Sequence, residues 1–160
     1  MVGKHKDFSL KEVNKFKLTE FRTLFSELRS PQISEMNGRF RSEFVGPGWL
    51  RTIAPPGLAP LGLGGWWGKT FDGQGGGMNI VQRQGELREI MPIVLKEEVS
   101  LINGRSGLNI TYPPGTRFPW PWVVDEIRWL DDNTILGMTL VTKAGMHRLA
   151  LPFLLHKNDN

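Results

Sequence analysis

The hydrophobic and polar positions of the chain follow two different periods. Over residues 8–29, apolar residues recur at steps of three and four, which places them on one face of a helix. Ser9 and Glu12 have the spacing of a capping box at its start, and Pro31 follows its end. The pattern predicts one continuous helix over 8–29 with its apolar face against the main body. A short helical turn over 34–38 is predicted next.

Beyond Phe40 the pattern changes to short runs that alternate with a period of two or are apolar throughout. Glycine, proline, asparagine and aspartate separate the runs, and the segments 103–105, 131–133 and 143–145 have the composition of hairpin turns. No helical period lies between the runs. We therefore expect a mainly β chain, an antiparallel meander of about eight or nine strands closed into a barrel or folded as a sandwich. The runs are 39–45, 66–71, 77–84, 86–95, 98–104, 107–113, 122–130, 134–142 and 147–157.

The length of 160 residues suits a single domain. Within it, we expect residues 1–37 to form a helical segment packed on the barrel and residues 38–157 to form the barrel itself. The chain has no cysteine, which excludes disulfides and thiolate chemistry and favours a reducing compartment. The charged N-terminus does not resemble a signal peptide, and no run approaches the length of a membrane span. These features predict a cytoplasmic protein without a membrane span.

Charge and spacing argue against several kinds of site. The formal charge is +4, and the lysines crowd into the first seventeen residues, with no basic aromatic stripe elsewhere. His5, His147 and His156 lack zinc-site spacing, and the glycine-rich segment 73–79 lacks the Lys-Ser/Thr of a phosphate loop. We therefore expect no nucleic-acid partner, no metal and no other cofactor.

The tryptophans lie in two clusters among glycines and prolines. The segment 38–73 is predicted to cross one end of the barrel in turns that no helix allows. Its tryptophans either plug the floor of the barrel or line a cavity, where each offers a large apolar surface and one N–H donor. Lined by both clusters, the cavity would suit a flat or polycyclic apolar ligand with a carbonyl or carboxylate group. The candidate ligand-binding tryptophans are Trp49, Trp66, Trp67, Trp120, Trp122 and Trp129.

Two adjacent carboxylates on the segment 123–130 are the candidate catalytic residues. Asp125 shares its face with apolar residues only, the pattern of a cavity wall with one polar group, whereas Glu126 shares its face with Arg128, which indicates solvent. A carboxyl group in an apolar cavity has a raised pKa and can act as a general acid or base. Asp125 is therefore the first candidate and Glu126 the second, because a slip of one residue would exchange their faces. Alternatively, the inward acid only pairs with an arginine, with Arg83, Arg88 or Arg117 as candidates.

Three further polar residues are candidate ligand-binding groups. The hydroxyl of Tyr112 could orient a ligand oxygen, and Asn79 could point inward as a hydrogen-bonding group. Lys69 could be a cation at the rim that meets a ligand carboxylate. A structural role for Tyr112, and a structural or solvent-facing role for Asn79 and Lys69, are the alternatives.

The order of motifs resembles an uncharacterised bacterial and fungal family named for a Gly-x-Trp-x-Gly signature, which is followed by a lipocalin-like segment of unknown function. The signature is incomplete, because Phe40 stands at the position of its tryptophan and Ser42 at that of its final glycine. The resemblance implies a calycin- or lipocalin-like barrel and gives almost no information on chemistry. The residues that match the motifs of the family are Glu35, Met36, Gly38, Arg39 and Phe40, then Gly65, Trp66, Trp67, Gly68, Lys69 and Phe71. The C-terminal part from Val123 is also similar.

Three functions fit these observations. The first is a barrel that binds a small hydrophobic, aromatic or polycyclic molecule. The second is a cofactor-independent enzyme, such as an isomerase, cyclase, hydratase or lyase, that uses the inward carboxylate. The third is an interaction protein with a filled barrel, which docks on a partner through its N-terminal helix. A homodimer through an open sheet edge or through that helix is a further possibility.

Overall fold

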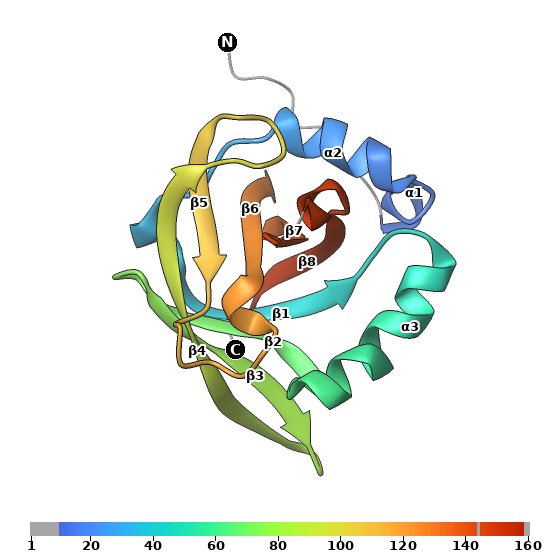
Figure 1. The fold of residues 1–160 in the computed structure, drawn as a ribbon. Coiled ribbons are helices and arrows are strands. Elements are labelled where there is room, and N and C mark those ends of the chain that lie inside the picture. The colour runs from blue at the N-terminus through green and yellow to red at the C-terminus, as the bar shows by residue number, and fades with distance from the viewer. Residues whose placement is uncertain (1–9, 144, 159–160) are drawn as a thin grey trace.

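The computed structural model describes residues 10–143 and 145–158, and its main body is a closed barrel of eight strands (Figure 1). Each strand pairs antiparallel with the next, and β8 pairs with β1 to close the ring. The predicted mainly β, antiparallel barrel is therefore confirmed. Its strands are β1 (Asn37–Phe44), β2 (Trp66–Asp72), β3 (Gly76–Arg83), β4 (Glu86–Val99), β5 (Ser106–Thr111), β6 (Val123–Asp131), β7 (Thr134–Val141) and β8 (Leu151–Asn158).

Nine predicted runs give eight strands because only the first two residues of the fifth run extend the fourth run, in the long strand β4, and residues 100–104 form the connection to β5. This strand pairs with β3 through a register shift between Met78 and Asn79, and Met91 beside the shift has a positive φ of 53°. Such a bulge bends a strand, which lets β4 curl around the barrel while it keeps both neighbours. The segment after β7 also differs from expectation. Instead of a three-residue turn, it contains a short 3-10 helix, η4 (Met146–Arg148), and β8 begins only at Leu151.

The predicted continuous helix over 8–29 is wrong, because the segment forms two helices, α1 (Leu10–Val13) and α2 (Leu18–Ser26). Asn14 lies in the break, where its Oδ1 accepts a hydrogen bond of 3.1 Å from the backbone N–H of Gly46. The backbone N–H of Lys17 donates to Glu20 Oε1 at 3.2 Å, so the capping interaction is at the start of α2. Ser9, the predicted cap, lies outside the described residues.

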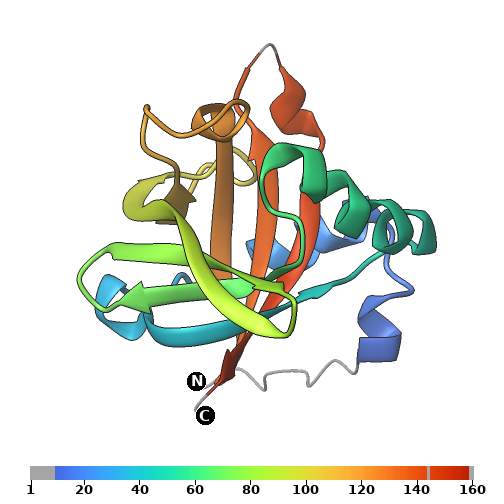
Figure 2. The same cartoon turned by 90° about the horizontal axis from the view of Figure 1, so that it is seen from below.

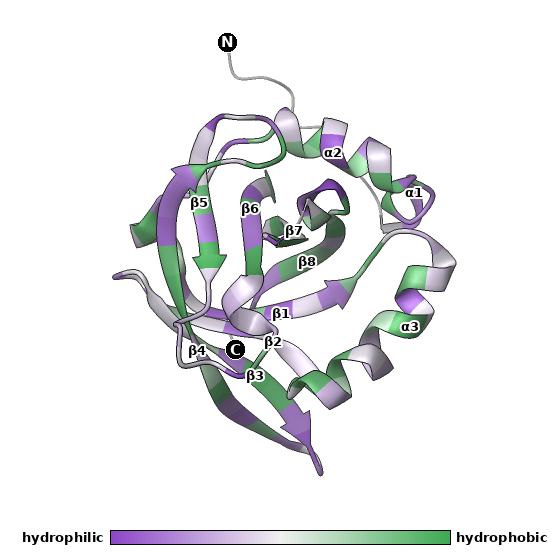
Figure 3. Ribbon diagram, viewed as in Figure 1, coloured by the Kyte–Doolittle hydropathy of each residue, from purple (hydrophilic) through white to green (hydrophobic). Residues whose placement is uncertain are grey.

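Helix α2 packs on the outside of the barrel and forms a second core there. Phe21, Leu24 and Phe25 on one face of α2 contact the outward side chains of β6, β7 and β8. Figure 3 shows apolar and polar residues alternating along the strands and the faces of this helix. The outer faces of β7 and β8 therefore also carry buried apolar residues, such as Leu136, Met138 and Leu154. After α2, the predicted turn over 34–38 is present as the 3-10 helix η1 (Ile33–Glu35).

The expectation that residues 38–73 hold no helix is also wrong. They contain α3 (Gly48–Leu58), followed by the 3-10 helix η2 (Ala59–Leu61). Pro55 and Pro56 lie within α3, and each lacks the N–H that would bond the previous turn. The helix begins where the N–H groups of Leu50 and Arg51 donate to Pro47 O. Figure 2 shows α3 lying beside one end of the barrel, and its contacts there outweigh its poor intrinsic helix propensity.

No helix within residues 10–143 and 145–158 has both the length and the apolar character needed to cross a membrane. The barrel interior holds the main core. It includes the inward residues Phe40, Phe71, Ile110, Ile127 and Leu155. Some members of this core, including Leu63, Tyr112 and Phe153, also line a cavity beside α3.

Candidate functional site

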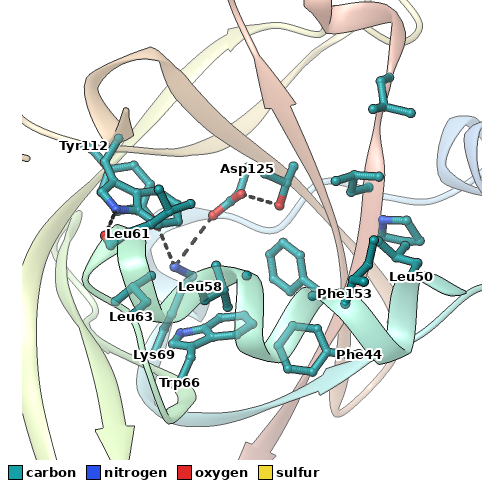
Figure 4. A pocket seen from close by; sticks show the side chains of 18 of the residues that line it. Phe44, Leu50, Leu58, Leu61, Leu63, Trp66, Lys69, Tyr112, Asp125 and Phe153 are labelled. Atoms are coloured by element: carbon teal, nitrogen blue, oxygen red, sulfur yellow. Dashed lines mark hydrogen bonds and ion pairs between the residues drawn. The ribbon is translucent and has the colours of Figure 1, made fainter. Parts of the chain in front are cut away.

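A cavity of about 320 Å³ lies between α3 and the interior of the barrel (Figure 4). One side of α3 forms its roof, with Trp49, Ile53, Ala54 and Leu58 spaced at helical intervals. The start of β2 and the segment before β8 contribute further apolar and aromatic side chains, including Phe153. A filled barrel, which the interaction-protein hypothesis requires, is therefore not what the structure has.

The polar groups of the cavity are concentrated at one place on its wall. Lys69 lies on the inward face of β2 and is only 1% exposed. Its Nζ donates a hydrogen bond of 2.7 Å to Asn79 Oδ1, its cross-strand partner on β3, and one of 3.1 Å to Tyr112 Oη. The Oδ2 of Asp125 lies 3.6 Å away, across the barrel on β6. Asn79, Tyr112 and Asp125 are themselves buried.

Thr139 completes the cluster on the side of Asp125. These two residues are cross-strand partners on β6 and β7, and Thr139 Oγ1 donates a hydrogen bond of 2.8 Å to Asp125 Oδ1. Asn79 is held in turn by a bond of 3.1 Å from its Nδ2 to the carbonyl of Met91, the residue with positive φ. The bulge of β4 thus helps to orient the amide that binds Lys69.

Burial shifts the protonation of all three ionisable groups. It lowers the pKa of Lys69, against the attraction of Asp125, and it raises the pKa of Asp125, against the attraction of Lys69 and the hydrogen bond from Thr139. Burial and the nearby carboxylate raise the pKa of Tyr112 well above 10, so its hydroxyl keeps its proton. Whether Lys69 keeps its proton therefore depends on whether Asp125 is charged. Both residues belong to the cavity wall.

One hydrogen-bond donor at the cavity has no acceptor. The Nε1 of Trp66 is inaccessible to solvent, and the described part of the chain offers it no partner. By contrast, Trp120 Nε1 donates to the carbonyl of Leu61 at 2.7 Å, which attaches η2 to the loop before β6. Buried donors are rarely left unpaired in native proteins. The Nε1 of Trp66 is thus an unpaired donor that is closed off from the space of the cavity.

Three of the six candidate tryptophans line this cavity and three do not. Trp49, Trp66 and Trp120 are part of its wall. Trp122 is 40% exposed and packs on Phe118 in the loop before β6. Trp129 points inward but belongs to a hollow at the opposite end of the barrel, and Trp67 lies on β2 outside the cavity wall.

Asp125 points into the barrel, as the alternation of apolar residues around it predicted. The interpretation of the Glu126 face as solvent-exposed is wrong, because Glu126 is fully buried and Arg128 is 2% exposed. Glu126 lies on the outer face under the β4–β5 connection, where its Oε2 accepts a hydrogen bond of 2.8 Å from Leu101 N. Arg128 packs over the ring of Phe25 at 4.6 Å. Glu126 therefore has no access to the cavity.

The expected partner of the inward acid and the expected position of Lys69 both need correction. Asp125 pairs with Lys69, whereas Arg83, Arg88 and Arg117 make their polar contacts elsewhere. Lys69 is not at the rim because its face of β2, shared with Phe71, is the inner one. This alternation could have revealed its orientation in the sequence. Thr139 was missed because nothing local marks it as the partner of Asp125.

The described histidines lie apart from the cavity wall. His156 on β8 contacts Glu43 on β1, with 2.6 Å between Nε2 and Oε2, and His147 belongs to η4. Residues 10–143 and 145–158 contain no group of three or more histidine, cysteine, aspartate or glutamate side chains placed to hold a metal ion. His5 lies outside the described residues.

Comparison with known proteins supports the fold and leaves the family open. No protein-family model matches the chain, and no curated protein matches it either. Among solved structures, the fold is similar to that of a protein from Thermomonospora curvata, with a TM-score of 0.69 and 16% identity over 90% of this chain and 89% of that one. Membership of the Gly-x-Trp-x-Gly family stays a prediction. The chain shares the barrel fold of the Thermomonospora curvata protein across nearly its whole length.

Proposed function

We propose that this barrel binds a small, neutral, apolar molecule in the cavity under α3. The observation that carries the proposal is an apolar cavity whose polar side chains gather at one place, around Lys69 and Asp125. Ligand sites typically combine an apolar wall with a few convergent polar groups, and about 320 Å³ is at the lower end of their usual volumes.

The aromatic wall favours a flat ligand. Trp49, Trp66 and Trp120 offer large, rigid apolar surfaces, and Phe44 and Phe153 lie at the same wall. Phe153 packs edge to face against Trp66, with 5.5 Å between ring centroids, so the aromatic groups form a continuous surface. An aromatic or polycyclic ligand would match this surface best.

The polar cluster favours an uncharged ligand group. The charge of Lys69 is balanced by Asp125, and both side chains are almost completely buried. A ligand carboxylate would bring a second anion to this pair in a medium of low polarity, which is unfavourable. A carbonyl or hydroxyl oxygen adds no charge to this pair and can still accept a hydrogen bond.

The first experiment is native mass spectrometry of the freshly purified protein, with solvent extraction of any bound compound. We expect a mass above that of the polypeptide or, if the cavity is vacated during purification, a rise in melting temperature with neutral aromatic compounds. The matching carboxylic acids should give a smaller rise. A bare polypeptide with no thermal response to either series would contradict the proposal.

A second candidate function is a cofactor-independent enzyme, an isomerase, cyclase, hydratase or lyase. The specific observation in its favour is that Asp125, a carboxyl with a raised pKa, faces the cavity beside a buried lysine. Such a group can donate or accept a proton near neutral pH. The test is to incubate the extracted compound with the protein and with D125N. Turnover that is lost in D125N while binding persists supports the enzyme, and an unchanged compound contradicts it.

A further inference from the structure

We propose that Lys69 is a nucleophile and that the ligand of this cavity is an aldehyde or ketone, which it holds as an imine on Nζ. The inference rests on the proposed function, because it requires an apolar carbonyl compound to enter the cavity under α3. It adds a covalent step and a chemical class of ligand to that function.

The position of Nζ carries the inference. Lys69 and Asp125 both belong to the cavity wall, so a molecule bound in the cavity would lie next to this pair (Figure 4). Two directions around Nζ are taken by Asn79 and Tyr112, at 2.7 and 3.1 Å. The third partner, Asp125, is 3.6 Å away, which is too far for a direct hydrogen bond. The amine is therefore oriented by Asn79 and Tyr112, and its contact with Asp125 is the longest of the three.

The surroundings also favour the neutral, reactive amine. Burial lowers the pKa of Lys69, and a lysine desolvated in an apolar pocket is an activated nucleophile. No other lysine of the described residues shares this environment, because all the others have exposed side chains. They are Lys11, Lys15, Lys17, Lys96, Lys143 and Lys157.

The step needs no oxidant, reductant or cofactor. The lone pair of Nζ attacks the carbonyl carbon, the carbon–oxygen π pair moves to oxygen, and that oxygen takes a proton. The hydroxyl of the resulting carbinolamine then takes a second proton and leaves as water, while the nitrogen lone pair forms the carbon–nitrogen double bond. The two protons that the oxygen gains equal the two that the nitrogen gives up. One amine and one carbonyl thus give one imine and one water.

Asp125 has two roles in this step. As an acid it supplies the proton that the oxygen takes, and as a carboxylate it accepts the proton that leaves nitrogen. When the imine is protonated, Asp125 is its counter-ion, just as it is the counter-ion of the free lysine. Thr139 holds the carboxyl in place through its bond of 2.8 Å to Oδ1. The charge in the cavity is the same before and after the reaction, which avoids burying a new charge.

The test is reductive trapping with 2-naphthaldehyde and sodium cyanoborohydride at pH 7, followed by intact mass and peptide mapping. Cyanoborohydride converts an imine into a stable secondary amine on the lysine that formed it. We expect Lys69 to be modified at least about tenfold faster than Lys143, an exposed lysine in the β7–β8 connection, because the cavity holds the aldehyde beside Lys69. The K143R variant should react as the wild type does, and K69R should lose the modification.

The corresponding alcohol, 2-naphthalenemethanol, separates this inference from the proposed function. It has nearly the same shape but forms no imine. If the alcohol raises the melting temperature and slows the modification of Lys69, the inference is supported. If the alcohol binds but the aldehyde modifies Lys69 no faster than the exposed lysines, the imine is refuted and reversible binding stands. If neither compound binds and Lys69 is not modified, both proposals fail. The decisive comparison uses the wild-type chain, so it does not depend on the folding of K69R.

Discussion

At the scale of single residues, the buried pair of Lys69 and Asp125 is the most sensitive feature of the molecule. Both groups are almost completely buried, and each is the ionisable partner of the other. Removing one partner leaves the other uncompensated, whereas removing both leaves an apolar wall.

We therefore expect K69M to lower the free energy of unfolding by about 3–5 kcal/mol, and the double variant K69M/D125L to recover most of this loss. Urea denaturation of the three proteins measures the effect. Equal stability of K69M and the wild type would show that the pair is not the buried, mutually dependent unit described above.

Glu35 gives a second prediction at this scale. Its hydrogen bonds with the Arg29 side chain and the Gln32 backbone lower its pKa to about 2. Because the folded pKa is below the unfolded value, its contribution to stability is full above about pH 4.3 and is lost as pH falls toward 2. Arg29 is 61% exposed, so solvent screens the interaction and the effect will be modest.

We expect E35Q to flatten the decline of the melting temperature between pH 4.5 and 2, as measured by circular dichroism at low salt. A matched scan of E86Q is the control, because Glu86 forms only a looser, exposed contact of 3.5 Å with Arg88. If the melting temperatures of E35Q and the wild type fall equally between pH 4.5 and 2, Glu35 does not contribute to the pH dependence of stability.

At the scale of elements, α3 decides whether the cavity is available. Ala54 lies in the wall of the cavity, whereas Thr52 is exposed and does not line it. A54W should fill part of the cavity of about 320 Å³ and lower the affinity for aromatic ligands by at least about tenfold. T52W should leave this affinity unchanged. Titration followed by intrinsic fluorescence or calorimetry measures both variants. Equal loss in the two would show that the side of α3 facing the barrel is not what the ligand contacts.

Strand β7 controls the shape of the same cavity through Gly137. A Cβ at this position would lie 2.2 Å from the ring of Phe153, which is part of the cavity wall. G137A should therefore displace the ring, cost about 1–3 kcal/mol of stability and change ligand affinity. G115A is the control, since a Cβ there meets nothing within 4 Å. Thermal unfolding of G137A and G115A, with and without ligand, measures the difference. Equal melting temperatures of the two variants would mean that Phe153 has room to move.

At the scale of the whole molecule, closure of the barrel separates two cores. Each strand pairs with a neighbour on both sides, but β4 pairs with β5 only over Val94–Val99, so the part of β4 from Glu86 to Ile93 has one unpaired edge. A dimer through this edge stays a prediction. A dimer through the N-terminal helices stays a prediction.

Much of this architecture could be predicted from the sequence because it is encoded locally. The period of two in the runs from Phe40 onward identified the strands, and the hydrophobic set around Asp125 indicated that this side chain points inward. The same alternation, applied to Phe71 and Lys69, would have placed the lysine inside as well. Periodicity determines which residues of a strand share a face, and this holds whatever the neighbouring strand is.

Only the tertiary structure decided the features that depend on contacts between residues far apart in the chain. Helix α3 forms despite Pro55 and Pro56 because the barrel end supplies an apolar surface for it, and Asn14 ends α1 because Gly46 is its partner. The pairing of Lys69 with Asp125 exists because closing the sheet into a ring places β2 opposite β6. The sequence by itself determined which residues are inside the barrel. Only closure of the sheet determined which of them meet across its interior, because no local period records a distance across the barrel.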